Sequence, residues 1–343
     1  MRNFILFSLI SLLFTGCKGE NKIVVVKGIY YWESKADSFS KAETEIINKT
    51  GIKKLYLKLF EVSYDEELGA VPISKTNLDW FTDFDSLNVI PCIYIQNDVL
   101  SNIETKEIEE LASNTFFLIS KKMDELISNP IPFSEIQIDC DWTPTTKKNY
   151  FKFLEILHQK SKLKLSCTLR LYPYKYSNKM GIPPVDRVML MCYNLLSPKN
   201  NEKKNSIFDL NEFKKYTDIA IDYPLPIDVA LPKYSWNICY ENTTFKGVVH
   251  GPQENLKHNL KTINPLWSIL QKDTVIDNLY LRRGYRIKHE TVSNETLEKL
   301  IDQLKIHTKF KDTITVTFFQ LDEEEFKQTS YEELDQLYRR FNN

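Results

Sequence analysis

The stretch Glu135-Ile136-Gln137-Ile138-Asp139-Cys140-Asp141-Trp142 combines a strand pattern with two acidic residues, and it decides the fold class of the chain. Because side chains alternate across a strand, the two isoleucines and Cys140 share one face, while Gln137, Asp139 and Asp141 share the other. In a closed barrel of parallel strands, the apolar face packs against helices and the polar face points into the lumen. We therefore expect this strand to form part of such a barrel.

Similar apolar runs occur along the rest of the chain, and amphipathic helical patterns separate most of them. The expected strands are 29–32, 54–60, 89–95, 135–142, 164–172, 188–194, 228–236 and 314–320, with helices over 104–127, 146–159 and 294–307. This order predicts an α/β protein with parallel strands and crossover helices. Eight such strands favour a (β/α)8 TIM barrel. A doubly wound sheet would carry a glycine-rich phosphate loop after its first strand, and none is present among the nine glycines.

The residues between the seventh and eighth expected strands form a long connection. Within it, 245–251 and 278–287 have the pattern of short β segments bent at glycine. We expect an insertion over about 240–293, on the catalytic rim or beside it, within a single barrel domain spanning 28–343.

The amino terminus has the pattern of an export signal. Met1-Arg2-Asn3 is followed by an apolar run over 4–14 and then by Thr15-Gly16-Cys17. The apolar run is too short to cross a hydrocarbon layer of roughly 30 Å as a helix. We expect a signal peptide over 1–16 and a linker over 17–27; an ordinary secretory signal with an incidental cysteine is the alternative.

The cysteine gives this signal a more specific interpretation. Thr15-Gly16-Cys17 resembles the bacterial lipobox, in which the cysteine is diacylated and becomes the mature amino terminus, although Phe14 stands where Leu is commoner. The resemblance implies a membrane anchor through the lipid on Cys17. Lys18 follows, where an Asp would retain a lipoprotein at the inner membrane of many Gram-negative bacteria. In such a cell, the resemblance together with the absence of that Asp implies that the protein is sorted to the outer membrane.

Composition excludes several function classes. The net charge is −1 and no basic stripe occurs, so we expect no nucleic-acid partner, and we expect a monomer. The histidines lack paired-ligand spacing and no Gly-x-Ser-x-Gly elbow occurs, so we expect no metal site, no cofactor and no serine hydrolase of that type. Buried thiols are the favoured interpretation of five cysteines beyond Cys17, with disulfides as the alternative: Cys92, Cys140, Cys167, Cys192 and Cys239.

Alternation on the other expected strands adds further lumen residues. The predicted lumen set is Lys58, Asp139, Asp141, Arg170 and Tyr193. Two carboxylates in an apolar interior are costly unless they are paired or functional, and neighbouring acids can have separated pKa values. A structural ion-pair network without turnover is therefore the alternative to an active site.

Aromatic residues gather near the ends of the expected strands. Aromatic faces can stack on the apolar faces of sugar rings, although aromatic side chains also fill ordinary cores. We take as catalytic candidates Asp141 and Asp139, and as ligand-binding candidates Trp32, Lys58, Trp142, Arg170, Tyr193, Asp222, Tyr223 and Trp236.

These residues carry a family resemblance. Asp139-x-Asp141 on the fourth strand, Met191-x-Tyr193 on the sixth and the insertion after the seventh resemble the chitinase-type glycoside hydrolase barrels of family eighteen. The stretch from Gln137 to Asp141 and the later Arg283-Gly284, with Arg286 and Glu290, also resemble a bacterial family of exported glycosidase-like barrels. The resemblance implies a barrel that acts on a glycan or binds one.

One position departs from the chitinase pattern. The proton-donating Glu of those enzymes would stand two residues after Asp141, where this chain has Thr143. A threonine cannot act as the general acid that protonates a glycosidic oxygen. In a hydrolase, Asp141 would then be the acid, with a second carboxylate from Glu33, Glu61, Asp222 or Asp322. Two hypotheses remain: an envelope-anchored glycosidase, and an inactive barrel that binds a glycan or an envelope protein.

Overall fold

The computed structural model describes residues 23–33, 39–77, 87–124, 133–199, 203–251, 256, 258–276, 279–327 and 329–342. The expected signal peptide over 1–16 and the expected lipidation site Cys17 lie outside these residues. Within them, no helix has the length and the apolar character needed to span a membrane.

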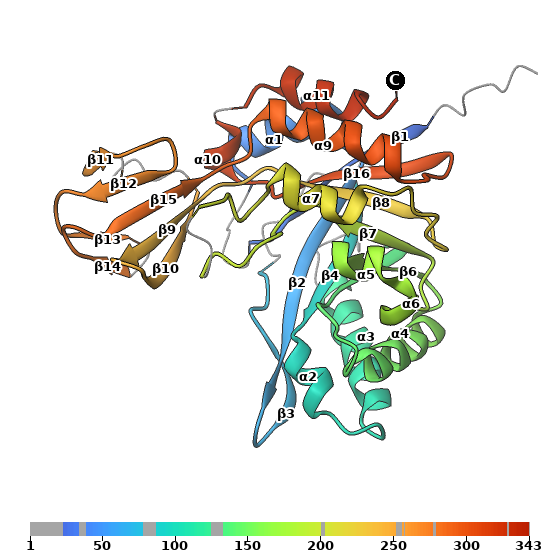
Figure 1. Ribbon diagram of the computed structural model, residues 1–343. Helices are drawn as coiled ribbons and strands as arrows, with labels where there is room; N and C mark the ends of the chain where they lie inside the picture. Colours follow the sequence, from blue (N-terminus) through green and yellow to red (C-terminus); the bar gives the residue numbers. More distant parts are fainter. Residues whose placement is uncertain are drawn as a thin grey trace, which may run out of the picture.

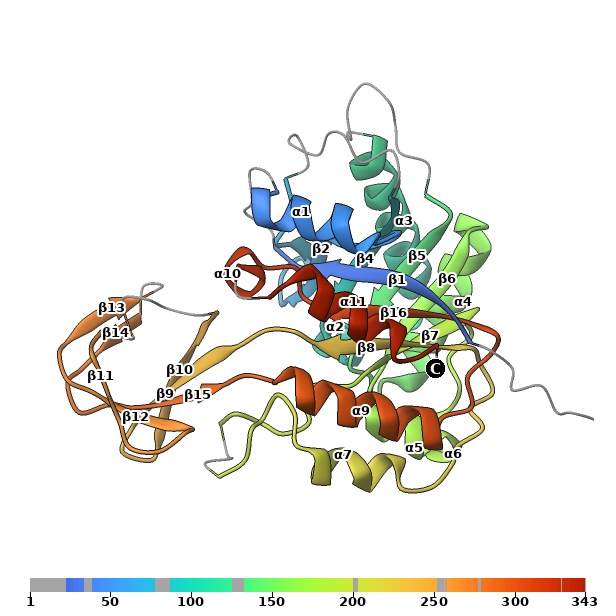
Figure 2. The same cartoon turned by 90° about the horizontal axis from the view of Figure 1, so that it is seen from above.

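The centre of the molecule is a closed barrel of eight parallel strands (Figures 1 and 2). Its spatial order is β1-β16-β8-β7-β6-β5-β4-β2, and pairing of β1 with β2 closes it. The barrel strands are β1 (Val24–Tyr31), β2 (Lys54–Asp65), β4 (Asn88–Ile95), β5 (Glu135–Asp139), β6 (Lys164–Leu169), β7 (Arg187–Met191), β8 (Ile227–Pro232) and β16 (Thr313–Phe319). All eight expected strands are present, and the (β/α)8 barrel is confirmed. The outer half of β2 also pairs with β3 (Gly69–Ile73) in an antiparallel hairpin.

Helices surround this barrel (Figure 2). They are α1 (Lys41–Thr50), α2 (Asn97–Asn102), α3 (Ile108–Asp124), α4 (Lys147–Ser161), α5 (Leu171–Lys175), α6 (Ser177–Met180), α7 (Leu210–Thr217), α9 (Asn294–His307), α10 (Glu323–Phe326) and α11 (Tyr331–Arg339). On α4, Tyr150, Phe153, Leu154 and Leu157 are all buried, because the spacing i, i+3, i+4, i+7 places them on one face.

The predicted orientation of β5 is also observed. Cys140 and the neighbouring Cys167 of β6 lie on the helix side, where both are close to Tyr150 of α4. Asp139 lies on the lumen side and accepts a hydrogen bond from Thr168. In the described part of the chain the five cysteines beyond Cys17 are buried and free, as the buried-thiol interpretation predicts.

A second, antiparallel sheet projects from one side of the barrel between β8 and α9 (Figure 1). Its order is β10-β9-β15-β12-β11, made of β9 (Trp236–Glu241), β10 (Thr244–His250), β11 (Leu260–Thr262), β12 (Trp267–Leu270) and β15 (Arg286–Glu290). A hairpin of β13 (Thr274–Ile276) and β14 (Leu279–Leu281) lies beside it. Residues of this region form a small hydrophobic core of their own, which includes Cys239, Leu270 and Ile287.

The expected seventh strand over 228–236 is two strands in the structure. The barrel strand β8 ends at Pro232, and β9 of the second sheet begins at Trp236. Proline has no N–H to donate to a sheet ladder, which favours an end of pairing there. The chain therefore leaves the barrel four residues earlier than the apolar pattern predicts, and Trp236 belongs to the second sheet.

Candidate functional site

Two acids and an arginine meet where β5 and β6 end, at the mouth of the barrel. Arg170 donates to both oxygens of Asp141, with Nε at 2.6 Å from Oδ1 and Nη2 at 3.0 Å from Oδ2. Asp139 lies deeper and accepts a hydrogen bond of 2.6 Å from the Thr168 hydroxyl. Burial, followed by the nearby Asp141, raises the pKa of Asp139 to about 6. The doublet thus contains one carboxylate in a two-point pair and one acid that is readily protonated.

Other lumen residues complete this group. Lys58 forms an ion pair with Glu61, and its ammonium lies 5.8 Å from the ring centre of Trp32. The ring of Tyr193 stacks on Phe319 with 5.1 Å between centroids. In the described part of the chain, the Tyr193 hydroxyl and Arg170 Nη1 are buried without a hydrogen-bond partner. Two donors at the mouth are therefore available to a ligand.

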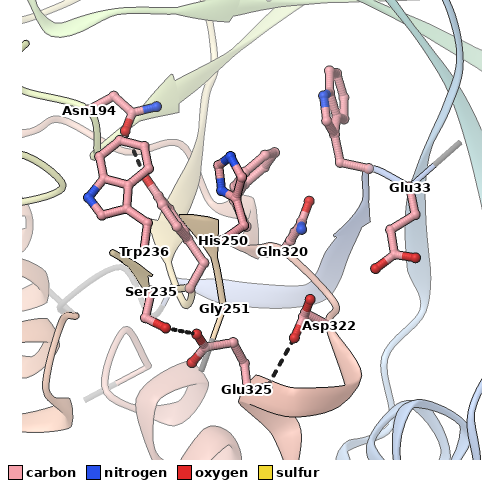
Figure 3. Close-up of a pocket in the computed structure, with 12 residues that line it drawn as sticks. Glu33, Asn194, Ser235, Trp236, His250, Gly251, Gln320, Asp322 and Glu325 are labelled. Atoms are coloured by element: carbon pink, nitrogen blue, oxygen red, sulfur yellow. Dashed lines mark hydrogen bonds between the residues drawn. The ribbon is translucent and has the colours of Figure 1, made fainter. Parts of the chain in front are cut away.

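A cleft of about 460 Å³ opens beside these residues, between the barrel mouth and the second sheet (Figure 3). Aromatic rings form much of its wall, with Trp32 and Phe319 5.8 Å apart and Tyr234 and Trp236 5.7 Å apart. The cleft is lined by Trp32, Glu33, Asn194, Tyr234, Ser235, Trp236, His250, Gly251, Phe319, Gln320, Asp322 and Glu325.

Hydrogen bonds hold two of these rings in place. The Tyr234 hydroxyl donates to Asn194 Oδ1 at 2.6 Å, and Trp236 Nε1 donates to Glu290 at 2.7 Å. Both rings are also largely buried. Their orientation is therefore fixed before any ligand arrives, which lowers the entropy cost of binding.

The structure brings together most of the residues predicted from the sequence. Lys58, Asp139, Asp141, Arg170 and Tyr193 share the lumen at the mouth, as their charges and contacts show. Trp32 and Trp236 line the adjoining cleft.

Three predicted residues lie elsewhere. Trp142 is only 5% exposed and stacks on Tyr150 of α4, because alternation turns it away from the lumen. Asp222 and Tyr223 precede β8, at the opposite end of the barrel from the mouth. There Asp222 pairs with Lys309, and Tyr223 packs near Tyr174 among the helices. The structure therefore places these three ligand-binding candidates apart from the acidic doublet.

Thr143 stands where a chitinase-type acid would stand, and its contacts are local. Its hydroxyl lies 2.8 Å from that of Thr145 and 3.2 Å from that of Thr146. Its backbone N–H donates to the Thr146 hydroxyl at 2.9 Å, just before α4 begins. The residue therefore shapes the entry into α4 and brings no carboxyl group to the mouth.

Several cleft residues were not selected from the sequence. Phe319 and Gln320 lie at the end of the expected strand 314–320, so their position was a usable signal. Ser235 and Glu325 come together from distant segments through a hydrogen bond, which no local pattern indicates. Among the described residues, no group of His, Cys, Asp and Glu is arranged to hold a metal ion.

Comparison with solved structures identifies the architecture. A chitinase from Chromobacterium violaceum superposes with a TM-score of 0.54 and 10% identity, over 92% of this chain and 98% of that one. The chain has the fold of the chitinase-type barrels. A chitinase-like agglutinin from Robinia pseudoacacia gives 0.52 and 11% identity, over 92% and 99% of the two chains. The Group IV chitinase of Ostrinia furnacalis gives 0.51 and 9% identity, over 93% and 100%.

The chitinase-type fold is thus shared at identities near one residue in ten. No protein-family model matches the sequence, and no curated protein is similar to it in sequence. The resemblance inferred from Asp139-x-Asp141 and Met191-x-Tyr193 is confirmed for the fold, and the chemistry has to be argued from this chain's own residues.

Proposed function

We propose that this protein is an exported, lipid-anchored envelope protein that binds a glycan at the mouth of its barrel without hydrolysing it by the chitinase mechanism. The observation that carries the proposal is the two-point pair between Arg170 and Asp141, in a barrel with Thr143 at the acid position.

The geometry of the mouth supports binding. Carbohydrate sites need aromatic faces for the sugar rings and a few fixed polar groups for the hydroxyls. The cleft offers Trp32, Tyr234 and Trp236, and the adjoining lumen offers the unpartnered Tyr193 hydroxyl. A chitinase-like agglutinin has a similar fold, so the fold also occurs in a protein named for agglutination.

The same geometry argues against chitinase-type turnover. Glycoside hydrolysis needs a protonated acid that reaches the glycosidic oxygen. Both Asp141 oxygens accept hydrogen bonds from Arg170, so neither is free to deliver a proton while this pair persists. Asp139 is the other acid of the doublet, and it lies deeper, bonded to Thr168.

Binding and turnover can be separated with a soluble form that begins at Lys18, which retains every described helix and strand. We expect retention on a glycan array with no release from chromogenic glycosides. Asp141→Asn should leave the absence of turnover unchanged. Turnover in the parent protein that Asp141→Asn abolishes would contradict the proposal, and so would an array on which no glycan is retained.

The anchor is supported by Thr15-Gly16-Cys17 and needs its own experiment. Several acyl chains on one cysteine would hold the protein stably, since each buried CH2 contributes about 0.8 kcal/mol. In cells, the full-length protein should fractionate with membranes and take up labelled palmitate, whereas Cys17→Ala should do neither. Equal membrane association of both forms would contradict lipid anchoring and leave the glycan proposal untouched.

A further inference from the structure

The cleft carries an excess of negative charge that the glycan proposal does not use. Glu33, Asp322 and Glu325 line it, with Glu33 at the right of the view and Asp322 and Glu325 at the bottom (Figure 3). Burial and then the nearby Asp322 raise the pKa of Glu33, and burial also raises the pKa of Glu325. Three carboxylates thus share a partly desolvated space.

Their partners on the protein are few. Asp322 accepts from the backbone N–H groups that begin α10, and Glu325 accepts from the Ser235 hydroxyl. In the described part of the chain, no ion pair or hydrogen bond engages the Glu33 carboxylate. Glu33 is therefore a half-buried acid that is not paired with any cation among the described residues.

The nearby lysines do not balance these charges. Lys58 is paired with Glu61, and Lys327 is paired with Glu323 and Glu324. Lys233 lies close enough to influence Glu325, but its pKa is lowered by burial and its ammonium donates to Asn294. Among the described residues, the cleft thus has three carboxylates, the imidazole of His250 and one neighbouring lysine that is not bound to another acid.

The shape of the cleft indicates which kind of cation fits. Its other walls are the rings of Trp32, Tyr234, Trp236 and Phe319, and aromatic faces attract organic ammonium groups. A volume of about 460 Å³ is in the range of small-molecule sites. An ammonium carried on an apolar ring matches both the aromatic and the acidic wall.

We propose that the cleft binds a glycan whose sugars carry free primary amines, as in a glucosamine oligosaccharide, in preference to its N-acetylated counterpart. The inference rests on the proposed glycan binding and adds the class of sugar. The ammonium would pair with Glu33 and lie against the aromatic wall. An acetamido group is neutral and would leave Glu33 desolvated without a partner.

Calorimetric titration of the soluble form with tetrasaccharides of glucosamine, N-acetylglucosamine and glucose tests this inference. Hydrogen bonds to charged groups predict that the glucosamine tetrasaccharide binds at least about tenfold more tightly than the acetylated one. Glu33→Gln should abolish most of that preference. Glu155→Gln changes the net charge equally on α4, where the side chain is 48% exposed, and should keep the preference.

The outcomes separate the two proposals. Equal binding of the amine and acetylated sugars would overturn the inference and leave glycan binding standing. A preference that survives in Glu33→Gln would overturn the assignment to this cleft. Binding of none of these sugars, together with an array on which no glycan is retained, would overturn the glycan proposal itself. Unchanged thermal unfolding of Glu33→Gln would show that the loss of preference is local.

Discussion

The lumen of the barrel has two layers of charged and polar side chains, and the two layers differ in how many of their polar atoms have a partner. The floor layer lies at the strand starts and comprises Lys54, Glu135, Ser166, Arg187 and Asp228. The mouth layer lies at the strand ends and comprises Lys58, Asp139, Asp141, Arg170 and Tyr193. In the floor layer the acids are almost fully buried and each of their oxygens has a partner. Arg187 Nε of the floor layer makes no hydrogen bond but lies 3.0 Å from Asp228, whereas two donors of the mouth layer, the Tyr193 hydroxyl and Arg170 Nη1, have no hydrogen-bond partner among the described residues.

This difference indicates that the floor layer stabilises the fold, whereas the mouth layer is available to bind a ligand. Glu135 accepts from the Ser166 hydroxyl at 2.7 Å and pairs with Lys54 at 3.4 Å, while Asp228 pairs with Arg187 at 3.0 Å. Such a closed network fixes the start of the barrel. At the mouth, Asp141 is 47% exposed and Arg170 is 30% exposed. Charges that remain open to solvent add little stability and are available to a ligand.

Removing one acid from each layer should give the largest difference in the free energy of unfolding between the two layers. Asp228 is 1% exposed, so Asp228→Ala would leave Arg187 and the Thr315 N–H without that carboxylate, and we expect a loss of about 3–4 kcal/mol in the free energy of unfolding. Asp141→Ala should cost at most about 1 kcal/mol, because its pair with Arg170 is screened by water. Urea unfolding of both variants measures the difference. Similar losses would remove the distinction between the layers.

The pH dependence of stability sharpens the same comparison. Burial raises the pKa of Asp228 to about 6, well above its value in the unfolded chain, so the folded protein binds this proton more readily. Its contribution is therefore full below about pH 4 and is lost as the pH rises to about 6, by about 3 kcal/mol. Asp139 has a similar shift, but its partial exposure makes the expected change smaller.

Measuring unfolding between pH 4 and pH 7 checks these signs. Asp228→Asn should flatten the decline of stability across this window more than Asp139→Asn does. The amide keeps an oxygen for the Thr315 N–H in the first variant and for the Thr168 hydroxyl in the second. A decline that is equally steep in Asp228→Asn and in the parent protein would show that the floor acid does not titrate there.

Overpacking the lumen should give a loss of stability between that of Asp228→Ala and that of Ser166→Ala. A Cβ added at Gly28 on β1 would lie 2.8 Å from the Thr317 methyl carbon and 3.2 Å from that of Thr315. Both threonines are nearly fully buried, so we expect Gly28→Ala to cost about 1–3 kcal/mol through overpacking. Thermal unfolding measures it. An unchanged melting temperature would mean that this part of the lumen is looser than its contacts indicate.

The barrel could be predicted because each of its strands is a short apolar run whose faces alternate. The ends of the strands were harder to predict, because the apolar pattern continues past Pro232 to Trp236, although the chain has already left the barrel. Hydrophobicity reports burial, and residues of the second sheet are buried as well. Only the proline marks the boundary.

The site could be predicted for residues that lie on strands, because side chains alternate between the two faces of a strand. That rule placed Asp139, Asp141 and Arg170 together, and applied one residue further it would have turned Trp142 towards α4. Asp222 was chosen for lying near a strand, but it precedes β8 and so belongs to the opposite end. The meeting of Ser235 with Glu325 depends on how β9 and α10 pack, which is a long-range contact without a local signal.

The smallest effect compares one hydroxyl from each layer. Ser166 donates to Glu135 within the floor layer, whereas the Tyr193 hydroxyl at the mouth has no partner among the described residues. Ser166→Ala leaves a buried carboxylate oxygen without its donor, and we expect a cost of about 1–2 kcal/mol. Tyr193→Phe removes a buried polar atom that gains nothing from folding, so stability should stay within about 0.5 kcal/mol or rise.

Ligand binding should reverse that order. If the Tyr193 hydroxyl donates to the bound glycan, Tyr193→Phe loses about tenfold in affinity while its stability does not fall. Ser166→Ala should unfold earlier and bind with the parent affinity. Urea unfolding and calorimetric titration of the same two proteins provide both readouts. If Tyr193→Phe destabilises the fold and leaves binding intact, the unpartnered hydroxyl has a structural role, and the mouth does not differ from the floor in the way its contacts indicate.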